Sequence, residues 1–178
     1  MTEVAAFAAW LGAAVIVLSD GRRGLALGLA TITAAFTVLA WLGGEHFAAS
    51  TLLLGGAVAC VQRMRTGPDV WGVMPPGSTA RLVLSIGGGL LALWIATSVM
   101  TGPGAPLRFA ALSVLGLMVA RVLGQAERTA VLTALAALAL SLAMAAGIAD
   151  ASPGPAPYIV AALIAAGTSL VRLEANAT

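Results

Sequence analysis

The amino-acid sequence predicts an all-α integral membrane protein, a polytopic bundle of transmembrane helices, from three observations. Hydrophobic residues make up 60% of the chain and charged residues 9%, whereas a soluble domain carries roughly 25% charged residues. Apolar runs near the length of a bilayer crossing follow one another along the chain, divided by short Gly, Pro or charged segments. The arginines fall almost entirely in alternate gaps between these runs. We therefore expect a bilayer to solvate most of the surface of this protein.

Seven apolar runs are candidates for membrane spans, because a helix needs roughly 20 apolar residues, with a range of about 17 to 25, to cross the hydrocarbon core. The first and third runs are slightly short for a full crossing. No positively charged region precedes the first run, so we expect a retained helix and not a cleaved signal peptide. The runs predict a single membrane domain over residues 1–178, with helices at 4–19, 24–43, 47–62, 82–101, 107–124, 129–148 and 158–171.

The basic residues predict the orientation of these spans. All nine are arginines, and seven crossings leave only Arg108 on the side of the N-terminus. The other side collects the remaining arginines: Arg22, Arg23, Arg63, Arg65, Arg81, Arg121, Arg128 and Arg172. Arginine-rich loops stay in the cytoplasm. The pattern thus predicts an inner-membrane protein of a bacterium with its N-terminus outside and its C-terminus in the cytoplasm.

The segment 63–81 is the longest polar interruption and separates the third span from the fourth. Its arginines can contact anionic lipid headgroups, at about 1 kcal/mol each, and its apolar side chains can dock a partner subunit. The alternative is a loop at the membrane interface, anchored by its tryptophan. The candidate docking residues for a partner or for lipid are Arg63, Arg65, Trp71, Met74 and Arg81.

Small residues predict close contacts between helices, because they let two backbones approach within van der Waals distance. Gly24 and Gly28 form a GxxxG pair at the start of the second span, and Gly87, Gly88 and Gly89 interrupt the fourth. We expect these five glycines to lie at helix-packing positions.

Two tryptophans, Trp10 and Trp94, stand near the middle of their predicted spans. Tryptophan prefers the headgroup level, where its amphipathic ring meets both lipid and water. For these two residues we therefore expect packing against a neighbouring helix or against a bound lipid.

The sequence carries no signature of catalysis. No ionisable residue lies in the middle of a predicted span, which argues against a proton pump or an ion-coupled carrier. His46 is the only histidine, and with Glu45 it lacks the three or four ligands of a metal site. Cys60 is the only cysteine. We expect no catalytic residue, no cofactor, no metal and no nucleic-acid partner.

The order of helices resembles the small seven-helix membrane subunit of hydrogenase-4 and formate-hydrogenlyase complexes, which is related to the K-type subunit of complex I. The resemblance rests on the basic turn Arg22-Arg23, the inner turn 120–128 and the last span ending at 169–173. That family carries an intramembrane carboxylate that the sixth span of this chain lacks. The resemblance implies a structural member of a larger complex, and not its proton-conducting part.

Two functions follow as hypotheses. The first is a non-catalytic integral membrane subunit that packs against other integral subunits of a respiratory, redox or antiporter-like complex. The second is a small substrate-binding membrane component of a transporter. A substrate-binding component needs polar or aromatic pocket residues near the outer face. The sequence offers four candidates there: Trp41, Glu45, His46 and Tyr158. A membrane enzyme is a third class, which has no acid–base or metal cluster to support it.

Overall fold

A computed structural model describes residues 1–66, 71, 78–99, 104–124, 127–149 and 154–170. Over these residues the chain forms seven α-helices, and the fourth continues into a π-helical turn, η1 (Ile95–Val99). The helices are α1 (Thr2–Leu18), α2 (Arg22–Leu42), α3 (His46–Arg65), α4 (Thr79–Trp94), α5 (Ala105–Leu123), α6 (Arg128–Ala149) and α7 (Ala156–Leu170).

The predicted all-α fold is confirmed, and each helix begins and ends within three residues of its predicted range once η1 is counted with α4. Five helices of the described part are long and apolar enough to cross a membrane: α2, α3, α4 with η1, α5 and α6. The other two, α1 and α7, are apolar but shorter. Helices suit such a sequence because they satisfy every backbone polar group inside the segment, where lipid offers no partner.

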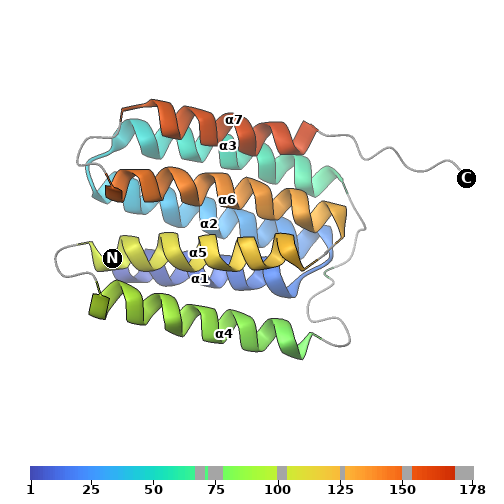
Figure 1. The fold of residues 1–178 in the computed structure, drawn as a ribbon. Helices are drawn as coiled ribbons and strands as arrows, with labels where there is room; N and C mark the ends of the chain where they lie inside the picture. Colours follow the sequence, from blue (N-terminus) through green and yellow to red (C-terminus); the bar gives the residue numbers. More distant parts are fainter. Residues whose placement is uncertain (67–70, 72–77, 100–103, 125–126, 150–153, 171–178) are drawn as a thin grey trace, which may run out of the picture.

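The helices form two layers, as Figure 1 shows. One layer holds α1, α2 and α3, and the other holds α5, α6 and α7. Across the layers α1 packs on α5, α2 on α6 and α3 on α7, so the two three-helix units run in the same directions. The remaining helix, α4, belongs to neither three-helix unit and lies at the edge, where it contacts α1 and α5.

Small apolar side chains fill the space between the two layers. Ile32 and Phe36 of α2 are fully buried, as are Ala137 and Leu140 of α6. Alanine recurs throughout this core, and its small side chain lets the helices come close together. Close packing matters in a membrane because lipid tails are as apolar as the core, so helices associate through van der Waals contacts. The interface between the layers is therefore a packed core.

One close approach in this packing joins α1 to α2. A Cβ atom on Gly28 would lie 2.7 Å from the carbonyl oxygen of Gly12 and 2.6 Å from Cγ1 of Ile16. A Cβ on Gly12 would in turn lie 2.8 Å from the carbonyl oxygen of Gly28. The two backbones thus touch directly, and any side chain at either glycine forces the helices apart.

The other glycines expected at packing positions differ among themselves. A Cβ on Gly24 would clash with the side chain of Ser19, and one on Gly89 would lie 2.2 Å from Nε1 of Trp10. Gly88 has only an ordinary contact with a leucine side chain, and a Cβ on Gly87 would meet no atom within 4 Å. A helix-packing contact for Gly87 is therefore not found among the described residues, where Gly87 is exposed on α4.

The two ends of the bundle differ in charge. We call the arginine end the one where α1, α3 and α5 finish and α2, α4 and α6 begin.

The loop between α3 and α4 is shorter than the predicted 63–81, because α3 continues to Arg65 and α4 begins at Thr79. Both helices can extend because an arginine stem is apolar and its charged head can reach a partner at the helix end.

We predict that Gly28→Ala destabilises the bundle by about 1 to 3 kcal/mol, the usual cost of overpacking a tight core. The matched control is Gly87→Ala, which adds the same methyl group to open space. The control is expected to be neutral or stabilising, because Ala favours a helix over Gly by about 1 kcal/mol. Thermal unfolding in mild detergent, followed by circular dichroism, measures both; equal effects would contradict the packing described for α1 and α2.

Candidate functional site

A charged junction joins three helices at the arginine end. Asp20 lies in the short turn between α1 and α2. Arg81 in the first turn of α4 donates from Nη1 to both carboxylate oxygens of Asp20, at 3.1 and 3.0 Å. Arg121 near the end of α5 donates from Nη2 to Oδ1 of Asp20 and, at 2.9 Å, to the carbonyl oxygen of Ser19. One carboxylate thus ties α1, α4 and α5 together.

Of the two arginines that contact Asp20, Arg121 is the more buried, so its loss would cost more stability than the loss of Arg81. The side chain of Arg121 is 3% exposed, whereas those of Asp20 and Arg81 are 32% and 35% exposed. Partial burial by itself raises the pKa of Asp20, but hydrogen bonds and charge from Arg121 and Arg81 outweigh it and lower that pKa below its ordinary value. Asp20 is therefore ionised at neutral pH and balances a buried positive charge.

The predicted docking residues fall into two groups. Two of them lie within helices and not in the loop: Arg63 is 4% exposed within α3, near the opposite charge of Glu127, and Arg81 is 35% exposed in α4, where it pairs with Asp20. Of these two, Arg81 connects α4 to the turn between α1 and α2. Arg65 is exposed.

Trp71 is a second described residue of the predicted loop that can meet a partner or lipid. Its side chain is 54% exposed. Its carbonyl oxygen approaches the start of α2 so closely that a Cβ on Gly24 would lie 3.0 Å from it. Met74, the remaining predicted docking residue, lies outside the described residues.

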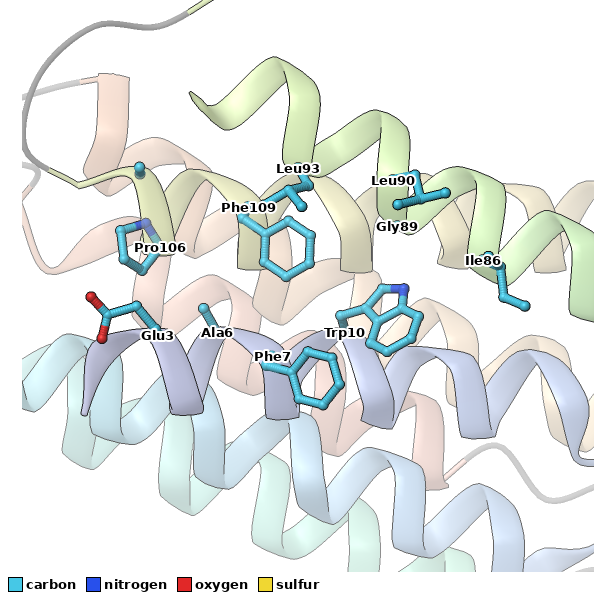
Figure 2. A pocket seen from close by; sticks show the side chains of 11 residues that line it. Glu3, Ala6, Phe7, Trp10, Ile86, Gly89, Leu90, Leu93, Pro106 and Phe109 are labelled. Carbon is cyan, nitrogen blue, oxygen red and sulfur yellow. The ribbon is translucent and has the colours of Figure 1, made fainter. Parts of the chain in front are cut away.

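A pocket of about 560 Å³ lies between α1, α4 and α5, in the half of the bundle away from the arginine end. Figure 2 shows Glu3 and Pro106 at one end of this pocket and Trp10 and Ile86 at the other. Of the described residues that line it, Glu3 alone is charged. The remaining walls are apolar and include the rings of Phe7, Trp10 and Phe109 and the leucines of α4. In chemical terms the pocket suits a ligand with a hydrocarbon body.

A hydrogen bond explains why Trp10 stands in the middle of its span. The indole Nε1 of Trp10 donates to the carbonyl oxygen of Ser85 in α4, at 3.1 Å. Gly89, one turn further along α4, leaves the room that the indole occupies. The expected packing of Trp10 against a neighbouring helix is confirmed, and its ring also forms one wall of the pocket.

The four residues singled out for a substrate pocket lie near one another at the end away from the arginines. Glu45 and Tyr158 line a second, smaller pocket of about 390 Å³ between α3 and α7. The rings of Trp41 and His46 are in contact, with centroids 4.4 Å apart. The structure thus groups them as two pairs, and the larger pocket is formed by other residues.

Among the described residues, no group of three or more His, Cys, Asp and Glu side chains is placed to hold a metal ion. No family model matches the chain, and neither a curated protein nor a solved structure matches it at a significant level. The candidate sites are therefore argued from their geometry and chemistry.

Sequence reasoning missed the junction and the large pocket. Asp20 was visible as the acidic residue beside Arg22 and Arg23, but its partners come from segments 61 and 101 residues away. The position of Trp10 in mid-span was the one sequence signal that pointed toward the pocket.

We predict that Arg121→Ala lowers the free energy of unfolding by on the order of 2 kcal/mol, since hydrogen bonds to charged groups contribute about 1.5 to 3 kcal/mol. The reason is that two acceptors, the carboxylate of Asp20 and the carbonyl of Ser19, lose their donor. Arg65→Ala is the control, because that side chain is exposed, and exposed substitutions usually stay within about 0.5 kcal/mol. Unfolding in mixed micelles of mild detergent and dodecyl sulfate measures both variants. A loss for Arg65→Ala as large as that for Arg121→Ala would contradict a specific role of the junction.

Proposed function

We propose that the chain is a seven-span protein of the bacterial inner membrane, with its N-terminus outside and its C-terminus in the cytoplasm. The distribution of charge supports this orientation. Among the described residues, Arg108 alone of the arginines lies at the end away from the arginine end, and arginine resists translocation. The shorter helices α1 and α7 have 17 and 15 residues. Thinning of the bilayer or snorkelling of flanking residues accommodates helices of that length at a modest cost.

We propose further that the protein is a non-catalytic subunit that packs against other integral membrane subunits. The observation that carries this proposal is the position of α4 at the edge of the bundle. In the most apolar window of α4 and η1, 22% of residues are buried, against 56% in α2. Leu90, Leu91 and Trp94 are each more than half exposed. A second chain packing on α4 would cover the least buried of the five long helices.

The packed core between the layers supports this role over that of a carrier. Transport proteins built from repeated units place their substrate site at the interface between the units, near the middle of the membrane. Here that interface is filled by alanine, leucine and phenylalanine side chains. The class of partner, a respiratory, redox or antiporter-like complex, is supported by the resemblance in helix order alone.

The alternative is a small substrate-binding membrane component, and one specific observation favours it. The pocket between α1, α4 and α5 lies within the 300 to 1,000 Å³ range that is typical of small-molecule sites. In the proposed orientation it lies in the outer half of the membrane, where such a component would meet its ligand.

The proposed topology is tested with reporter fusions. A reporter fused after Arg172 is expected to be active in the cytoplasm, and one inserted in the turn 43–45 is expected to be active outside. The reason is the arginine bias between the two ends of the bundle. Activity on the same side for both fusions would contradict an odd number of crossings between them.

The proposed subunit role is tested by purifying the tagged protein from its native membrane in mild detergent. We expect other integral membrane chains to co-purify in fixed ratio. Leu90→Arg on the exposed face of α4 is expected to release them, because a buried unpaired charge at an interface is costly. Leu54→Arg on the exposed face of α3 is the matched control. A protein that purifies alone in stable form would overturn the subunit role and leave the alternative.

A further inference from the structure

The pocket between α1, α4 and α5 occupies one half of the thickness of the bundle. On α1 its lining runs from Glu3 to Trp10, and on α4 it runs from Ile86 to Leu93. At 1.5 Å of rise per residue, each stretch is about 10 Å long. One leaflet of the hydrocarbon core is about 15 Å thick. The pocket therefore begins at the membrane surface away from the arginine end and stops short of the midplane.

The lining of the pocket restricts what its buried part can bind. The carboxylate of Glu3 is 80% exposed and lies at the mouth. Deeper in, the indole N–H of Trp10 already donates to the carbonyl of Ser85. A polar group of a ligand placed there would find no partner among these side chains, at a cost of several kcal/mol. The buried part of the occupant is therefore hydrocarbon.

The size of the pocket excludes a partner helix as its occupant. A helix about 10 Å in diameter that rises 1.5 Å per residue fills about 120 Å³ per residue. A partner helix that crosses the membrane is also about 30 Å long, so a pocket lined over only about 10 Å would seat a third of its length. A hydrocarbon chain that lies parallel to the helices can enter a pocket of this size and pack against the apolar rings of Phe7 and Phe109.

We propose that this pocket binds one acyl chain of a phospholipid from the leaflet at the Glu3 end. The chain enters beside Ala105 and Pro106, lies along Phe7 and Phe109, and ends against the indole of Trp10. The lipid headgroup stays outside the pocket, at the level of Glu3. This inference rests on the proposed placement in a membrane, but on neither the orientation nor the subunit role.

The test uses Trp10 as its own reporter. A full-length protein with Trp41→Phe, Trp71→Phe and Trp94→Phe keeps Trp10 as its one tryptophan, and the three replaced side chains are all more than half exposed. The protein is placed in phosphatidylcholine vesicles in which a rising fraction of the lipid carries bromine on its acyl chains. We expect the fluorescence of Trp10 to be quenched strongly by brominated chains and weakly by acrylamide in the water.

Two narrowing variants and a control make the result specific to the pocket. In the same background, Ala105→Phe narrows the mouth from α5 and Leu93→Phe fills the wall on α4. Each is expected to remove most of the quenching by brominated lipid. Ala57→Phe adds the same ring to an exposed position on α3 and is expected to leave the quenching unchanged. Helix content by circular dichroism establishes which variants are folded, and two separate variants keep the test independent of either one.

Three outcomes would overturn the proposal. Quenching of Trp10 by acrylamide as strong as that by brominated lipid would indicate a water-filled site for a compact ligand. Quenching by lipid that survives both narrowing variants would mean that chains reach Trp10 by another route. Absence of quenching by brominated lipid would mean that no chain enters. The reporter fusions test the orientation separately, so either proposal can fail while the other stands.

Discussion

Asp20 places one negative charge between two arginines, and the arrangement of α4 depends on it. Arg81 belongs to α4 and Arg121 to α5, so the ion pairs connect segments 61 and 101 residues from Asp20. The arginine head of α5 is buried, and a buried charge without a partner is strongly destabilising. A buried ion pair adds little net stability over a good apolar contact, but its loss is costly. The junction therefore specifies which helix ends meet, while apolar packing supplies most of the stability.

The apolar packing is uneven along the chain. It is dense in the six helices of the two layers and sparse around α4, whose surface can contact another molecule. Within each layer and between the layers, alanine and glycine bring helices to backbone distance, as Gly12 and Gly28 do. By contrast, α4 buries only Ser85, Gly89 and Ala92 along its helical length. It is held at its first turn by Arg81 and near its middle by Trp10, whose indole takes the space that Gly89 leaves. Binding surfaces are expected where a helix has few internal contacts, and this criterion selects α4.

The helices could be predicted from the sequence because their signal is local. A run of apolar residues near the thickness of a bilayer, ended by Gly, Pro or charge, determines a span without reference to the rest of the chain. The junction could not be predicted, because the pairing of Asp20 with Arg121 depends on α1 packing beside α5. The same reason applies to Arg63: its charge marked the end of a span, but the residue lies within α3 and is buried near the opposite charge of Glu127. The pocket depends on where α4 departs from α1, which no local pattern encodes.

The two attachments of α4 also explain why a pocket forms on one side of Trp10 only. From Arg81 to Ser85 the helix is held against α1 and the turn that follows it, first by the ion pair with Asp20 and then by the indole hydrogen bond from Trp10. Beyond Gly89 the side chains of Leu90 and Leu93 line the pocket in place of close contacts with α1. Further on, Arg108 of α5 donates to the carbonyl oxygen of Ala96 in the π-helical turn, at 3.4 Å, and brings the end of the helix back to the bundle. The pocket is thus bounded by contacts at both ends, which makes it a feature of the fold that persists as long as the junction at Asp20 holds α4 in place.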